Sequence, residues 1–166
     1  MSLLAFSESS RSNPLEEVER VAAGHDWTFE RLSEDEVTIL ASGRWTDYQV
    51  SFTWMTDIEA LHLACVFDLK VPERRRAEVQ LLISLINEQL WVGHFDLWPQ
   101  DGIVMYRHAL MLSGGMAASS AQCEALLKTA LETCERYFSG FQFVVWAGKP
   151  AREALSAAMF ETSGEA

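Results

Sequence analysis

Alternating hydrophobic and polar positions predict four consecutive β-strands in the first half of the chain. The clearest alternation lies within residues 47–54, where every second residue is large and apolar: Tyr48, Val50, Phe52 and Trp54. The following segment has the same period, with one apolar face made of Leu61, Leu63, Cys65, Phe67 and Leu69. Two shorter segments, around residues 27–31 and 37–41, precede them. Because short turn signals separate these segments, the pattern predicts an antiparallel meander.

Helical periodicity lies on both sides of the meander. Asn13-Pro14 predicts the start of a helix that runs to about Gly24, since a side-chain cap followed by proline favours a helix N-terminus. A second helix begins near residues 71–73, and its apolar positions are spaced by three and four: Val79, Leu82, Ile83, Ile86 and Leu90. A third helix begins at Ser119, which forms a capping-box pattern with Gln122.

The remaining segments complete an α+β pattern. Two more strands, around residues 93–98 and 103–112, flank a strong turn signal. Residues 141–146 fit a helix or a strand; their aromatic residues continue the preceding helical stripe, which favours a helix, and a last short helix runs to about Met159. We find no repeat and no linker, so the sequence predicts one α+β domain over residues 13–162. The Ser-rich residues 1–12 are predicted to be a disordered tail.

Composition narrows the class of protein. The chain has 24 acidic and 13 basic residues, a net charge of −11, and 49% hydrophobic residues. This balance excludes a disordered acidic tail and argues against a nucleic-acid binder. No apolar run is long enough for a membrane helix, and the first residues lack the pattern of a signal peptide. Three cysteines leave at least one unpaired, which favours a reducing compartment, so we expect a cytoplasmic protein.

One strand carries a possible chemical site. His94, Asp96 and Trp98 alternate on it, and pairing across the turn places Arg107 on the same face, with His108 opposite. A histidine beside a carboxylate suggests a metal site or a general base. However, Arg107 repels a cation and favours an ion pair with Asp96, so the structural interpretation is preferred. We therefore expect no metal, no cofactor and no catalytic site; the alternative is a small-molecule sensor or an undetected enzyme that uses this face.

A surplus of apolar surface predicts a second subunit. Leu81 and Leu85 widen the apolar stripe of the second helix to about 200°, more than one packed layer needs. Such a helix is covered either by another helix or by a second copy of the chain. The aromatic run near the C-terminus also exceeds one face. We therefore predict a homodimer contact at four residues: Leu81, Leu85, Phe141 and Trp146.

Five segments together resemble a known family. They are Asp26–Arg31, Gly43–Tyr48, Ile86–Trp98, Tyr106–Leu110 and Cys134–Trp146. In order and spacing they are similar to the YbjN-domain family, in its alphaproteobacterial form, over roughly residues 14–162.

The resemblance implies a fold similar to type III secretion chaperones, with helices on one side of an antiparallel sheet, and proteins that often pair as dimers. It also implies a bacterial sensory transduction regulator with links to motility and stress. The family has no accepted catalytic residues, and none is assigned here. We therefore expect a non-enzymatic, homodimeric, chaperone-like regulator that binds a protein partner, whose identity the sequence leaves open.

Overall fold

The computed structural model describes residues 13–163 of the chain; the predicted tail, residues 1–12, lies outside the described residues. The elements follow one another in an order that matches the predicted α+β pattern. They are α1 (Pro14–Gly24), β1 (Thr28–Ser33), β2 (Glu36–Ser42), β3 (Asp47–Met55), β4 (Ala60–Lys70), α2 (Arg76–Gln89), β5 (His94–Trp98), β6 (Ile103–Met111), α3 (Ser120–Val145) and α4 (Ala151–Ser163). Two short 3₁₀ turns, Thr56–Ile58 and Glu73–Arg75, lie before β4 and α2.

All six strands form one antiparallel sheet in the order β1-β2-β3-β4-β6-β5. The first four strands are neighbours in sequence order, which confirms the predicted meander. After α2 the chain returns through β5 at the far edge, and β6 then fills the position between β5 and β4. The two edges of the sheet are therefore β1 and β5.

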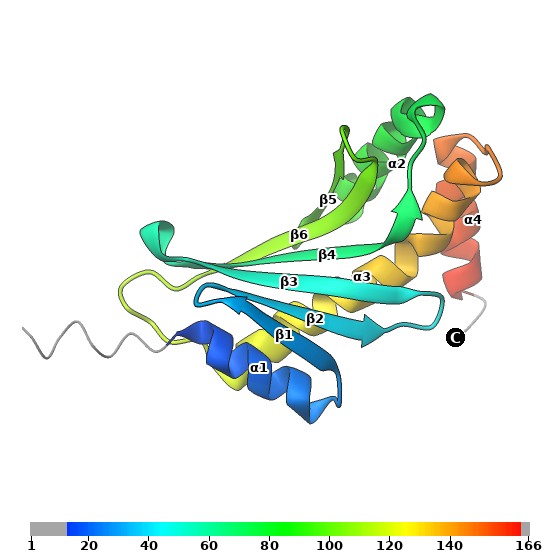
Figure 1. Cartoon of the computed structure of the whole chain (residues 1–166). Helices are drawn as coiled ribbons and strands as arrows, with labels where there is room; N and C mark the ends of the chain where they lie inside the picture. The colour runs from blue at the N-terminus through cyan, green and yellow to red at the C-terminus, as the bar shows by residue number, and fades with distance from the viewer. Residues whose placement is uncertain (1–12, 164–166) are drawn as a thin grey trace, which may run out of the picture.

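The helices share one face of this sheet, as predicted (Figure 1). α1 packs against β1, β2 and β3, whereas α3 packs against β4 and β6 and α2 packs against β5. α4 forms an outer layer on α3 and α2. The core between sheet and helices is aromatic at one end, where the Phe141 ring lies 5.7 Å from Phe67 and 5.3 Å from Phe95, measured between centroids.

Local sequence signals set the helix ends. The Asn13 side chain accepts a hydrogen bond from the backbone of Leu15, and Ser119 and Gln122 form the predicted capping box. α3 continues to Val145 with Trp146 as its C-terminal cap, so the helical interpretation of residues 141–146 is confirmed. α4 is longer than predicted and ends at Ser163.

The wide apolar stripe of α2 is covered in part by another helix, one of the two predicted alternatives. The completely buried residues of α4 are all small: Ala151, Ala154 and Ala158. Gly140 of α3 lies close to both neighbours, since a Cβ added there would be 3.5 Å from Ala158 and 3.9 Å from Leu82. Small residues therefore allow α2, α3 and α4 to approach closely.

Candidate interaction surfaces

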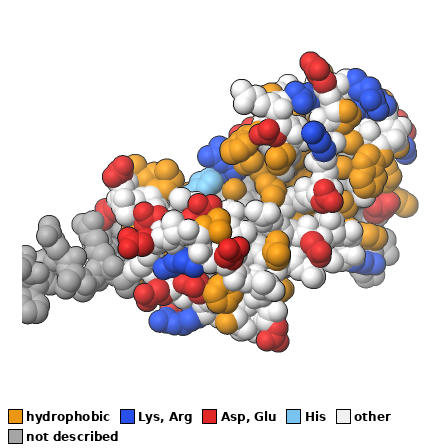
Figure 2. All heavy atoms as spheres, viewed as in Figure 1, with side chains coloured by type: hydrophobic (Ala, Val, Ile, Leu, Met, Phe, Trp, Pro, Cys, Tyr) orange, Lys and Arg blue, Asp and Glu red, His pale blue; other side chains and the backbone are white. Residues whose placement is uncertain are grey.

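The face of the sheet opposite the helices carries both polar and apolar side chains. Polar residues dominate β3, whereas Ala64 and Val66 of β4 and Met105 of β6 form an apolar centre. Figure 2 shows this face, with hydrophobic side chains gathered over β5 and β6 and a histidine beside them. Trp98 is 50% exposed and Met111 is 60% exposed. We call this surface, with Leu40 at its other end, the open sheet face.

The predicted ligand face lies on the open sheet face. The register pairs His94 with Arg107 and Asp96 with Met105, so the four predicted residues His94, Asp96, Trp98 and Arg107 share one side. Arg107 Nη1 lies 3.6 Å from Asp96 Oδ2, a loose ion pair between partly exposed groups. Within residues 13–161 no group of three His, Cys, Asp or Glu side chains is arranged to hold a metal ion.

The cavity nearest to these residues has a different lining from the one predicted. A cavity of about 320 Å³ is lined by His62, Gly93, His94, Arg107, His108 and Ala109. Asp96 and Trp98 do not line it, whereas two further histidines do. His62 comes from β4, and its place depends on β4 lying beside β6, which no local pattern in the sequence indicates. We call this space the histidine cavity.

Hydrogen bonding and charge set the state of these histidines. Arg107 Nε donates to Nε2 of His62 over 3.3 Å, which requires that nitrogen to be unprotonated. Burial, together with the charge of Arg107 and the nearby His94, lowers the pKa of His62. Burial and His94 also lower the pKa of His108. Both side chains are therefore neutral near pH 7.

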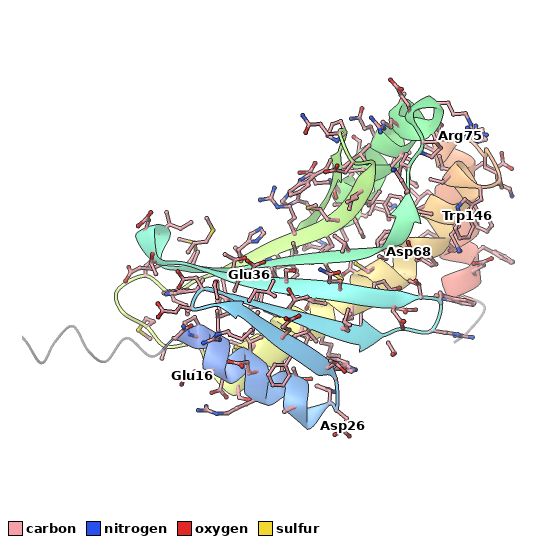
Figure 3. All side chains as sticks on the ribbon, viewed as in Figure 1. Glu16, Asp26, Glu36, Asp68, Arg75 and Trp146 are labelled. Carbon is pink, nitrogen blue, oxygen red and sulfur yellow. The ribbon has the colours of Figure 1, made fainter. Side chains whose placement is uncertain are left out.

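The four residues predicted for the homodimer contact do not form one surface. Leu81 is 43% exposed, Leu85 is half-buried, and Trp146 is 65% exposed. Phe141 is completely buried among the chain's own aromatic residues, so we remove it from the predicted contact. Trp146, five residues later, caps the C-terminus of α3, on the side of the molecule where Arg75 precedes α2 (Figure 3).

Two exposed apolar residues were missed by the sequence analysis. Trp91 is fully exposed and Val92 is 51% exposed, in the short segment between α2 and β5. The signal was present, because Trp91 and Val92 follow the last periodic position of the helix and precede a strand. Leu81, Leu85, Trp91 and Val92 therefore lie on one helix and the segment that follows it. We call these four residues the α2 strip.

A larger cavity, of about 640 Å³, lies between the β2–β3 turn and the outer side of α3. The guanidinium of Arg44 stacks over the Trp45 ring at 4.8 Å from the ring centroid. The backbone N–H of Arg44 donates to the Glu135 carboxylate over 2.8 Å. Burial, and next the Glu135 carboxylate, raise the pKa of Tyr48, which lies at the same wall. Glu135 thus joins the turn to α3.

No helix in the described part of the chain is long and apolar enough to cross a membrane. The three cysteines are free, and Cys65 and Cys134 face each other in the core with 3.6 Å between their sulfur atoms.

Comparison with solved structures finds two similar folds. One is the crystal structure of YbjN from E. coli, described as a putative transcription regulator; it is 8% identical, with a TM-score of 0.53, and the match covers 73% of this chain and 85% of that one. The other is the ExsC–ExsE complex, in which the matched chain is 16% identical, with a TM-score of 0.50 and coverage of 78% and 92%. At these identities the likeness shows the fold alone. No curated protein matches the sequence.

The family comparison agrees with the fold. The α+β arrangement of a six-stranded antiparallel sheet with helices on one face is the type III secretion chaperone-like fold that the resemblance predicted. The YbjN family model, described as "Putative bacterial sensory transduction regulator", matches residues 14–143, from α1 through most of α3. This chain is a member of the YbjN family.

Proposed function

We propose that this protein is a non-enzymatic regulator of the chaperone-like kind, which works by binding another polypeptide and does so as a homodimer. The observation that carries the proposal is the α2 strip, in which a fully exposed Trp91 and a half-exposed Val92 follow the end of α2, whose Leu81 is also exposed. Exposed tryptophan on an otherwise well-packed domain is typical of an interaction surface. Family membership and the two similar folds agree with a regulator.

A second copy of the chain is the occupant that we propose for the α2 strip. Leu81 and Leu85 are four residues apart and so are neighbours along the helix surface. In a two-fold dimer the same strip contacts itself, which suits an apolar surface better than a charged one. Each copy carries a net charge of −11, so the proposed contact is confined to the apolar strip, with the exposed Glu88, three residues after Leu85, at its margin. Trp146 lies outside this strip and is proposed as a contact at its margin.

The open sheet face is the surface that we propose for a protein partner. Its exposed apolar groups, Leu40, Trp98 and Met111, are spread over β2, β5 and β6. The fold neighbour ExsC was solved as a complex with another protein, which supports a polypeptide partner here. The three free thiols suit the reducing cytoplasm, where we place the protein. The process that we propose is bacterial regulation of the stress or motility type.

Light scattering coupled to size-exclusion chromatography tests the dimer. We expect the wild-type chain to elute as a dimer at micromolar concentration and Leu81→Glu to elute as a monomer. Leu32→Glu is the matched control, because Leu32 is an exposed leucine on β1, away from α2, and its variant should remain dimeric. A wild-type monomer, or equal loss of the dimer in both variants, would contradict the proposal.

Affinity capture from the native cytoplasm tests the partner surface. We expect a protein that the wild-type chain retains and that Trp98→Asp loses, while Phe160→Asp, which changes an exposed aromatic residue of the outer helix α4, still retains it. The variants must first show circular dichroism spectra equal to wild type, so that loss of binding is not loss of fold. If Trp98→Asp retains the same proteins as wild type, the open sheet face is not the binding surface.

A further inference from the structure

Three of the four histidines in the chain line the histidine cavity, together with Arg107. The protein as a whole carries a net charge of −11, so a cluster made only of groups that can be positive is unusual on its surface. We propose that the histidine cavity binds a small oxyanion, of the carboxylate or the phosphate and sulfate type, and takes up protons as it does so. This inference is independent of the proposed function.

The cavity exists because two neighbouring strands differ in length. β5 begins at His94, which pairs with Arg107, so the next residues of β6 have no strand on that side. On their other side they continue to pair with β4, where Leu63 lies opposite His108 and His62 opposite Ala109. The end of β5 therefore leaves a notch in the sheet. Gly93, whose φ of +68° favours glycine, directly precedes β5 and lines this notch.

Arg107 is held in place at the cavity wall. Its Nε donates to His62 over 3.3 Å, and its Nη1 lies 3.6 Å from the Asp96 carboxylate on β5. These two contacts orient the planar guanidinium. A guanidinium has five N–H groups, so donors remain for an oxyanion, whose paired oxygens match the fork geometry. A cation is disfavoured at the same place because Arg107 repels it.

The histidines of the cavity can become positively charged when an anion binds. Near pH 7, Asp96 balances Arg107, and His62 and His108 are neutral because their pKa values are lowered by burial and by their basic neighbours. An oxyanion in the cavity reverses that influence, since a negative charge favours the protonated form of a histidine. Protonated His62 no longer accepts from Arg107 Nε, so this N–H of Arg107 becomes free to donate to the anion. His94, which pairs with Arg107 across the sheet, supplies a third imidazole to the cavity lining. Anion binding is therefore coupled to proton uptake.

The coupling has a definite sign. A site that takes up one proton on binding gains about tenfold in affinity for each pH unit of acidification, as long as the free histidine is neutral. Affinity for an oxyanion should therefore rise as the pH falls from about 7.5 toward 5.5, where histidine begins to charge.

Histidine side-chain NMR tests the proposal on the full chain. The probes are sodium sulfate and sodium acetate, whose own charges stay nearly constant over this pH range, with sodium chloride as the ionic-strength control. We expect saturable shifts for His62, His94 and His108, with tighter binding at lower pH. His25 is the internal control, because it lies on α1's C-terminal cap and contacts Glu124 at 2.6 Å. The anion that binds more tightly identifies the carboxylate or the tetrahedral class.

Two variants separate binding from general charge effects. Arg107→Gln should abolish the saturable shifts, whereas Arg136→Gln, which removes an exposed arginine on α3, should leave them unchanged. If Arg107→Gln does not fold, His108→Gln should retain binding but show a weaker dependence on pH. Shifts at His25 equal to those in the cavity, no saturation, or affinity that is independent of pH would each overturn the proposal.

Discussion

The side chain of Asn87 forms two hydrogen bonds with the backbone of one residue, Phe95. Its Nδ2 donates to the Phe95 carbonyl over 3.0 Å, and its Oδ1 accepts from the Phe95 N–H over 2.8 Å. Phe95 lies on the edge strand β5, and Asn87 lies near the end of α2. A side-chain amide thus takes the place of a neighbouring strand at the centre of this edge. Satisfied edge groups do not template pairing with another chain.

Asn87→Ala should lower the free energy of unfolding by about 1–3 kcal/mol, because two partly buried backbone groups lose their partner. The variant should also aggregate faster on heating, since the β5 edge becomes available for pairing. Urea unfolding followed by circular dichroism measures the first effect and light scattering the second. Ser84→Ala is the control, as Ser84 is an exposed residue of the same helix. Equal midpoints for both variants would contradict the assigned role.

Gly93 is constrained twice, by its backbone and by Tyr106. Its φ of +68° is a conformation that favours glycine, and an added Cβ would contact the Tyr106 ring and hydroxyl. Gly93→Ala should therefore cost about 2–4 kcal/mol, the sum of left-handed strain and overpacking. Gly114→Ala is a matched control, because its φ is +82° but nothing lies within 4 Å of an added Cβ. It should show the strain alone, about 1 kcal/mol. Equal losses for the two variants would refute the steric contribution of Tyr106.

Local periodicity was enough to predict the elements of this fold, and the structure shows why. The strands of the meander are neighbours in sequence, so alternation in each one indicates the same buried face. The capping signals of Asn13 and Ser119 act within one helical turn. By contrast, the fully buried residues of α4 are alanines, which give only a weak apolar stripe, so its role as a cover for α2 did not follow from pattern.

The sites were harder to predict because they depend on contacts between distant residues. Phe141 was predicted to be at the surface because its segment is apolar on more than one face, but β5 and the sheet cover it from sides that the helix pattern does not reveal. His108 was excluded from the ligand face by strand alternation. The register agrees with that alternation, because His108 pairs with the buried Leu63; His108 nevertheless lines the cavity, because β5 ends beside it. His62 is 45 residues from Arg107, and only the β4–β6 pairing joins them.

The thiols should be unreactive in the folded chain. Burial raises the pKa of Cys123 to about 11 and, with Cys65 next to it, raises the pKa of Cys134. Cys65 is itself completely buried. Because the thiolate is the reactive form, a disulfide reagent at about pH 8 should modify none of the three thiols quickly. After unfolding in guanidinium, all three should react. A thiol that reacts at once in the native protein would show that the core around it opens readily.

Tyr106 should make the fold sensitive to alkali. Burial raises its pKa to about 12, and its hydroxyl donates to the Val92 carbonyl over 2.9 Å. Since an unfolded tyrosine has a pKa of about 10, the unfolded chain loses a proton that the folded chain keeps above that pH, so stability falls as pH rises from there. Tyr106→Phe should lose about 1 kcal/mol at neutral pH with its hydrogen bond. Its stability should then decline less than that of wild type between about pH 9 and 11, because the phenol no longer titrates. Urea unfolding midpoints at each pH measure both effects. If the stability of both proteins declined equally with pH, Tyr106 would not be the group that makes the fold sensitive to alkali.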